Sequence, residues 1–151
     1  MAGPRYDVDI GEFIKKIPEF INGLKKRVAR ELLISIVNPE GKDPFKTGSY
    51  ISSHRIGVGA PDDAVIILKK GAVTVEQAKA SVLVRGLSKL SSAINVDDDL
   101  FISNSVPWAK RVEYSGWVGT SPYLVYEKAV QKIEPQIPKY VDQIEKSMGM
   151  D

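Results

Sequence analysis

Apolar side chains recur at spacings of three and four residues through the first quarter of the chain, which predicts one long amphipathic helix over residues 9–38. The series is Ile10, Phe13, Ile14, Ile17, Ile21, Leu24, Val28, Leu32 and Ile36. Asp9 can cap this helix, and Glu12 three residues later completes a capping box. Pro18 removes one backbone hydrogen bond inside the series, so we expect a kink there or a helix in two pieces.

Alternating and β-branched segments predict a small antiparallel sheet after this helix. Turn-forming residues fill positions 38–44, and extended segments at 49–60 and 64–69 are expected to pair as a hairpin. A further strand is expected at 100–104, after an acidic turn. A sheet of three to four strands has exposed edges, which are either protected or used to pair with a neighbouring chain.

Two helical regions complete the pattern. Thr74, with Gln77 as its capping-box partner, starts a helix whose apolar stripe extends to Ile94. Residues 81–84 within it also suit a strand. After Pro122, a helix is expected over 123–133 and a last helical piece over 139–148.

The predicted fold class is therefore α+β: a long N-terminal helix, an antiparallel sheet of three to four strands, and helices packed on one face. A chain of 151 residues fits one domain with a single core. We expect a flexible arm at 1–8, one α+β domain over 9–134 and a C-terminal helical extension at 135–151.

Composition excludes several classes of protein. The apolar fraction of 43% and the charged fraction of 26% are typical of a soluble globular chain. No apolar run approaches the ~20 residues that a membrane span needs, and the first residues lack the pattern of a signal peptide. Without cysteine, neither a disulfide nor a thiolate metal site can form.

The residues that most suggest chemistry are better explained as structural. His54 is the single histidine and has no ligand pattern around it, so a hydrolase built on it is a third-ranked hypothesis. Asp97, Asp98 and Asp99 lack calcium-loop spacing, and the glycines at 57 and 59 lack the rest of a phosphate loop. We expect no catalytic, cofactor-binding or metal-binding residues and no enzymatic activity.

Residues 100–116 form the most distinctive stretch of the sequence. A strand runs into Pro107, which cannot donate to a ladder, and helical spacing then places Trp108, Ala109, Val112 and Tyr114 near one face. Gly116 follows where a helix would close with positive φ. The pattern predicts a strand, a proline corner, a short helix and a glycine stop.

This stretch resembles the signature of the minor tail component, or tail-completion (neck), family of tailed bacteriophages. That signature is a strand, Asn-x-x-Pro-Tyr-Ala, Glu-Tyr-Gly, and a proline before a last helix. The similar elements here are at 102–109, 112–116 and 121–125, and residues 47–53 resemble the family's Thr-Gly-x-Leu-x-x-Ser element. The chain differs from the family in having Trp108 for Tyr, Tyr50 for Leu and an inserted Ser115.

The resemblance implies a structural virion protein: a ring-forming subunit of the head–tail neck, acting in tail completion, termination or connection. It would be made in the bacterial cytoplasm and reside in the virion. Its partners would be further copies of itself, as a hexamer or alternatively a dodecamer, and the adjacent neck, connector and tail-tube proteins. Contact with DNA in the channel would be incidental, and no membrane is involved.

Subunit-interface candidates combine the matched motif positions with exposed aromatic residues. Trp117 lies between two glycines and is expected to be exposed on a loop, where a tryptophan is an effective interface anchor. The candidates are Thr47, Gly48, Tyr50, Arg55, Asn104, Pro107, Trp108, Glu113, Tyr114, Trp117 and Pro122.

The alternative function is a small nucleic-acid-binding or regulatory protein. It would use the basic helix face of Lys25, Lys26, Arg27 and Arg30, whose charges can neutralise phosphates. A net charge of +2 gives this alternative little support, and such a cluster is more often a solvated helix face.

Overall fold

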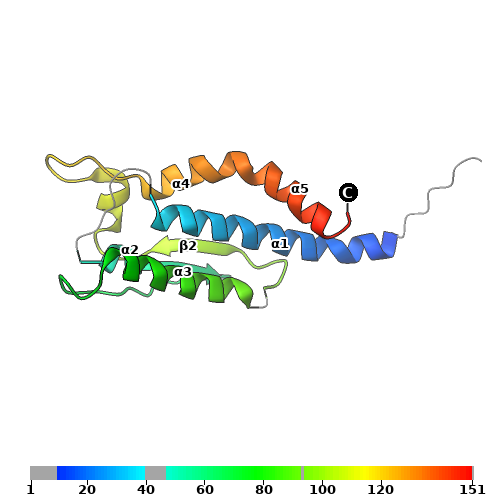
Figure 1. Ribbon diagram of the computed structural model, residues 1–151, viewed down its shortest axis with the longest axis horizontal. Coiled ribbons are helices and arrows are strands. Elements are labelled where there is room, and N and C mark those ends of the chain that lie inside the picture. The colour runs from blue at the N-terminus through cyan, green and yellow to red at the C-terminus, as the bar shows by residue number, and fades with distance from the viewer. Residues whose placement is uncertain (1–9, 40–46, 93, 151) are drawn as a thin grey trace, which may run out of the picture.

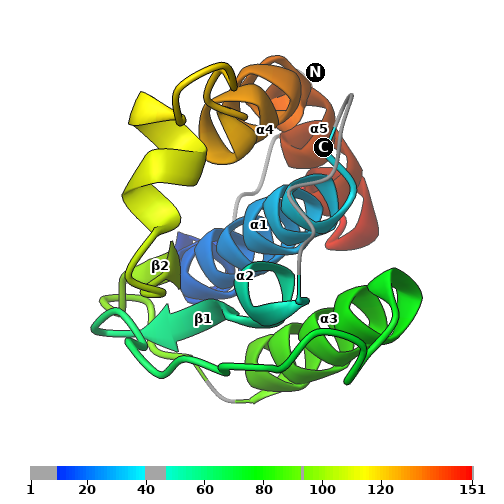
Figure 2. The same ribbon diagram turned by 90° about the vertical axis from the view of Figure 1, so that its left-hand side faces the viewer.

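Helix α1 (Ile10–Val37) is the axis on which the other elements pack. The computed structural model describes residues 10–39, 47–92 and 94–150. It has an α+β fold in which α1 lies between the sheet with α3 on one side and α4 with α5 on the other (Figures 1 and 2). The arm expected at 1–8 and the cap expected at Asp9 lie outside the described residues.

Pro18 does not divide this helix: α1 is a single element of 28 residues, so of the two expected outcomes the helix in two pieces is wrong. The physical reason is tertiary: the C-terminal helix lies along α1 on both sides of the proline. Lys16 Nζ donates to the carbonyl of Met148, 3.4 Å away, and the guanidinium of Arg27 lies 4.6 Å from the ring centre of Tyr140. These contacts hold helical geometry across a position that lacks one backbone hydrogen bond.

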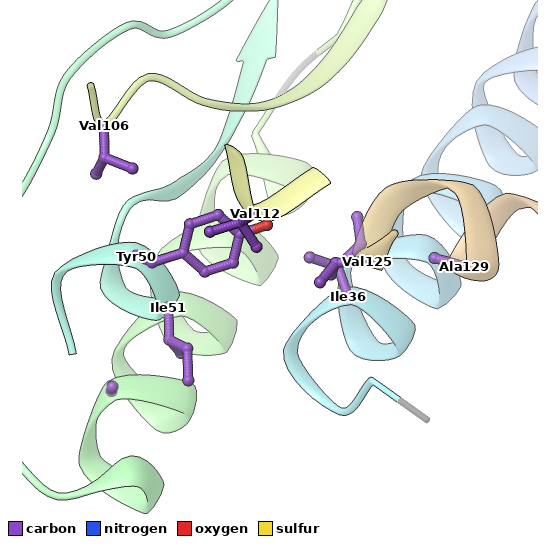
Figure 3. Close-up of a cluster of buried hydrophobic side chains, with 8 residues drawn as sticks. Ile36, Tyr50, Ile51, Val106, Val112, Val125 and Ala129 are labelled. Carbon is purple, nitrogen blue, oxygen red and sulfur yellow. The ribbon is translucent and has the colours of Figure 1, made fainter. Parts of the chain in front are cut away.

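The buried face of α1 contributes to two apolar clusters. One cluster joins Leu33 to Ile56 of β1 and Val82 of α3. Gly86 allows this approach, because a Cβ at that position would overlap the side chain of Leu33. The other cluster joins Ile36 to residues of α2, α3 and α4. In Figure 3, Tyr50 and Ile51 extend from α2, and Ile36 of α1 lies beside Val125 of α4.

The sheet has two strands in the described residues rather than three to four. Strand β1 (His54–Val58) pairs antiparallel with β2 (Leu100–Asn104), in a register that sets His54 opposite Asn104 and Ile56 opposite Ile102. The strand expected at 49–60 is wrong in its first part, because α2 (Ser49–Ser52) forms one helical turn there. Gly48 precedes that turn with φ 91°, a left-handed conformation that suits glycine.

The strand expected at 64–69 is also wrong, because this segment pairs with side chains instead of a strand. Ile66 N–H donates to Ser53 Oγ at 2.9 Å, and Ser53 Oγ donates to Ile66 O at 3.1 Å. Leu68 N–H donates to Ser49 Oγ at 2.7 Å, and Ser49 Oγ lies 3.4 Å from Leu68 O. We call these two hydroxyls the serine clamp. A hydroxyl both donates and accepts, so two serines one helical turn apart replace a partner strand.

The later helices agree with the sequence pattern more closely. Helix α3 (Val75–Ser91) begins with the predicted box: Gln77 N–H donates to Thr74 Oγ1 at 3.1 Å, and Thr74 N–H donates to Gln77 Oε1 at 2.9 Å. Residues 81–84 are helical, whereas Ile94 lies beyond the helix end. A reciprocal cap of this kind defines a helix start from local sequence alone.

The strand–corner–helix unit is present, with a wider helical turn than expected. After β2, η1 (Arg111–Ser115) is a π-helix closed by Gly116 at φ 62°. The chain continues through α4 (Val125–Ile133), η2 (Glu134–Gln136) and α5 (Ile137–Ser147), and α5 packs on α1. No helix within the described ranges is long and apolar enough to cross a bilayer.

Replacing both clamp serines, Ser49→Ala with Ser53→Ala, is expected to release the segment around Ile66 and Leu68. Hydrogen exchange of those two amides should become about tenfold faster or more, since each loses its acceptor. Ser52→Ala on the same helical turn is the control, because it leaves both clamp hydroxyls in place. Unchanged exchange at the two amides in the double variant would show that the clamp does not hold the segment.

Candidate subunit-contact pocket

A pocket of about 640 Å³ opens between α2, the end of the clamped segment, the corner before η1 and the loop before α4. Its wall combines aromatic rings, hydroxyl groups and aliphatic side chains. The lining residues are Thr47, Ser49, Tyr50, Ile67, Leu68, Trp108, Val112, Trp117, Thr120 and Tyr123. We call it the aromatic pocket. Such a wall favours a ligand or segment that is mainly apolar and has a few polar groups that can bond to the hydroxyls of the wall.

Four of the sequence-derived interface candidates line this pocket: Thr47, Tyr50, Trp108 and Trp117. They come from two regions about sixty residues apart, which the fold brings together. Gly48 supplies the bend between Thr47 and Ser49, whose side-chain oxygens lie 2.8 Å apart. Pro122 lies in the chain between lining residues Thr120 and Tyr123, and a Cβ at Gly116 would crowd its nitrogen.

Trp117 is 40% exposed, which confirms the expectation of an exposed side chain. Its backbone makes a closed turn, because the N–H groups of Trp117 and Thr120 each donate to the other's carbonyl at 2.9 Å. Gly116 and Gly119 adopt positive φ at the two sides of this turn. The guanidinium of Arg111 lies 6.0 Å from the indole centre. The ring is therefore presented by a defined turn at the rim of the pocket.

A buried polar network lies behind Tyr50. Asn104 Nδ2 donates to the carbonyl of Tyr50 at 2.7 Å, and Asn104 Oδ1 accepts from Val106 N–H at 3.3 Å. These two backbone groups fix the orientation of the amide, so its NH₂ group also donates to His54 Nδ1 at 3.2 Å. Tyr126 Oη lies 2.8 Å from the same nitrogen. His54 therefore ties β1, β2 and α4 together.

His54 is neutral in this setting. Since Nδ1 accepts hydrogen bonds, the imidazole proton is on Nε2, which is buried and has no hydrogen-bond partner in the described structure. Burial, reinforced by the Arg85 charge, lowers the pKa of His54 to about 3. Burial likewise raises the pKa values of Tyr50 and Tyr126 far above the usual phenol value, with the Glu113 charge adding to both. The histidine is structural, as its sequence context indicated.

Glu113 is buried and caps helix α4. Its Oε2 accepts from Tyr126 N–H at 3.0 Å, and its Oε1 accepts from Glu127 N–H at 2.9 Å. A carboxylate at this position meets both the free N–H groups and the positive end of the helix dipole. Leu124 just before the helix has φ 53°, an unusual value for leucine. The π-turn of η1 thus positions the start of α4, and with it Tyr123 of the pocket.

Seven of the eleven interface candidates do not line the pocket. Gly48 and Pro122 adjoin lining residues, Asn104 and Glu113 make the buried hydrogen bonds described above, and the other three lie elsewhere. Arg55 is opposite Ser103 in the sheet, and Pro107 is exposed at the corner. Tyr114 is 68% exposed, so it does not share the buried face of Trp108, Ala109 and Val112. The physical reason is that a side chain two positions after Val112 points to the opposite side of the helical turn.

The sequence interpretation missed several lining residues. Ile67 and Leu68 were assigned to a hairpin strand, and their position depends on the serine clamp. Tyr123 was treated as the start of a helix, whereas α4 begins at Val125. The repeated serines at 49 and 53 were a usable signal, because their spacing places both hydroxyls on one side of a helical turn.

The basic residues proposed for nucleic-acid binding make contacts within the chain. Lys25 Nζ donates to the carbonyls of Val96 and Asp98 at 2.5 and 2.7 Å, which anchors the turn before β2. Arg27 and Arg30 both lie 3.2 Å from a carboxylate oxygen of Glu31. Lys25 thus holds the acidic turn against α1, whereas the ion pairs of Arg27 and Arg30 are partly exposed and contribute little to stability.

Among the residues with a described position, no group of three or more His, Asp or Glu side chains is arranged to hold a metal ion. Comparisons of the chain with known protein families, with curated proteins and with solved structures found no match.

The lowered pKa of His54 should be visible in how the unfolding free energy changes with pH. Its folded pKa of about 3 lies below the ordinary value near 6.5, so its contribution is present above pH 6.5 and is lost as the pH falls toward 3. Between pH 6.5 and 4.5 the wild type should lose about 2 kcal/mol more unfolding free energy than His54→Gln. Urea unfolding at both pH values measures this, and equal losses would show that His54 titrates normally in the folded chain.

Glu113→Gln is expected to lower the unfolding free energy by about 1–3 kcal/mol, since an amide offers one acceptor oxygen and loses the charge that faces the helix dipole. Glu134→Gln, at an exposed position after α4, is the matched control and should change stability little. Denaturant unfolding of both variants at neutral pH tests this. Equal effects would contradict the capping role.

Proposed function

We propose that this chain is a structural, non-enzymatic virion protein of a tailed bacteriophage, and that its copies form a ring in the head–tail neck. One observation carries the proposal: two of the segments that resemble the neck-family motif contribute to one open aromatic pocket. Thr47 and Tyr50 come from the segment 47–53, Trp108 and Val112 come from the stretch 102–116, and Trp117 lies beside them. The motif order along the chain suggests the family, and the pocket gives these residues a surface that a neighbouring subunit can contact.

In the proposed assembly, a neighbour inserts an apolar side chain or segment between Tyr50, Trp108 and Trp117. Trp117 is the anchor, because its ring is half exposed while its backbone is already held in a closed turn. An ordered loop loses little conformational entropy when it binds, which favours association. Identical contacts repeated by rotation close a ring, for which we propose sixfold symmetry with twelvefold as the alternative.

The ring would lie between the head connector and the tail tube, or at the end of the tube. The protein would be made in the cytoplasm of the bacterial host and then incorporated into the virion. Neighbouring neck, connector and tail-tube proteins would contact the two faces of the ring. Joining head to tail requires shape and contact rather than catalysis, and the buried, neutral state of His54 agrees with such a role.

Electron microscopy of a lysate from phage lacking this gene tests the proposal, before and after addition of the purified chain. Filled heads and free tails that join on addition would support the neck function. Tails of uncontrolled length would move the assignment to tail termination. Normal infectious particles formed without the protein would overturn the virion proposal.

Trp117→Ala should reduce head–tail joining in the same assay, because truncation of an aromatic anchor costs about 2 kcal/mol or more in an interface. Val84→Ala is the control, since Val84 is 71% exposed on α3, away from the pocket. Both variants should keep their circular dichroism spectra. If the Trp117→Ala variant joins heads to tails as well as the wild type does, Trp117 is not an interface anchor.

A further inference from the structure

The first two turns of α1 carry an apolar stripe that the described part of the chain leaves exposed. Ile10, Phe13, Ile14 and Ile17 are 67%, 48%, 56% and 37% exposed. Their spacing of i, i+3, i+4 and i+7 places them on one face of the helix. Figure 1 shows this end of α1 extending beyond the sheet and α3. We call these four residues the α1 stripe.

A second uncovered apolar surface lies farther along the molecule. A groove of about 630 Å³ runs between α1, β2 and α4. Its wall is mainly apolar and includes Val28, Leu32, Leu100 and Ile102, and the charged residues Lys25 and Asp99 also line it. Val130 of α4 also lines it and is 47% exposed. Strand β2 pairs on one edge with β1 and has no strand on its other edge in the described structure. We call this surface the α4 groove.

The stripe and the groove match the two halves of a known recognition mode. An amphipathic helix binds a hydrophobic groove through anchors spaced i, i+3, i+4 and i+7, which is the spacing of the stripe. Within one copy the two surfaces cannot meet, because the stripe and residues Val28 and Leu32 of the groove belong to the same continuous helix. Among the described residues, the α1 stripe is the largest group of exposed apolar side chains on one helix face, and it can reach the groove only from another copy.

We propose that the α1 stripe of one copy binds in the α4 groove of the next copy. The contact is heterologous, so each copy uses its stripe on one neighbour and its groove on the other. In a closed set of copies every stripe and every groove is then covered, whereas a stripe-on-stripe dimer would leave all grooves open. Closure into a neck ring rests on the proposed function, but the pairwise contact does not.

Cross-linking between two separately purified variants tests the contact, and the absence of native cysteine makes the result specific. Phe13→Cys is mixed with Val130→Cys and treated with a short bismaleimide at up to millimolar protein concentration. A cross-linked dimer of the two variants is expected. The control mixture pairs Phe13→Cys with Val84→Cys on α3, which should give none.

Each other outcome overturns the proposal. Dimers of Phe13→Cys with itself in preference to the mixed dimer would mean that stripes pack on each other. Equal yields with the control would mean random collision, and no dimer at millimolar concentration would mean that another partner covers the stripe.

A charge in the stripe provides a second measurement. Ile14→Glu should weaken self-association by about tenfold or more, because the contact would bury a carboxylate without a partner. Analytical sedimentation measures this association. Glu19→Ala, on the opposite side of the same helix, should leave it unchanged. Equal association of Ile14→Glu and wild type would overturn the contact. Copies that cross-link as expected but fail to join heads to tails would instead count against the neck function alone.

Discussion

The hydrogen bonds shared by His54, Asn104 and Tyr126 join the two parts of the fold that pack on α1. The imidazole belongs to β1, the amide to β2 and the phenol to α4, so these elements keep a fixed relation as long as the three side chains remain bonded. The surroundings are of low dielectric, where an unpaired polar group is costly. Movement of α4 away from the sheet would leave His54 Nδ1 and the Asn104 amide with fewer partners. The network therefore selects one arrangement of helix and sheet.

The aromatic pocket depends on that arrangement. Tyr50 forms part of the pocket wall, and its ring also meets His54 edge-on, with 4.9 Å between ring centres. Glu113 fixes the start of α4 directly after Tyr123, another wall residue. The pocket is thus shaped by buried polar groups rather than by the flexibility of its loops. Under the proposed function, this surface is organised before a partner arrives, which limits the entropy lost on binding.

Local signals allowed part of this fold to be predicted from sequence. The apolar period gave the extent of α1, the Thr74–Gln77 box gave the start of α3, and Gly116 gave the end of η1. The failures share one cause, which is that tertiary contacts replaced local preference. Residues 64–69 have the composition of a strand but pair with serine hydroxyls, and Pro18 stays helical because α5 lies along it. For the pocket, Thr47, Tyr50, Trp108 and Trp117 were named from the sequence as contact candidates, whereas Ile67 and Leu68 were not.

The serine clamp holds the loop at residues 66–68 through its main chain, so the position of this loop does not depend on which side chains it carries. Both serines bond to the main chain of residues 66 and 68, and the side chains of Val65 and Ile67 are 40% and 61% exposed. Replacing these side chains would leave the bonds that hold the loop intact. Ile67 also lines the aromatic pocket, so an exchange there alters what the pocket accepts without altering the scaffold. Substitutions in this loop can therefore change the surface of the pocket while the backbone beneath it stays in place.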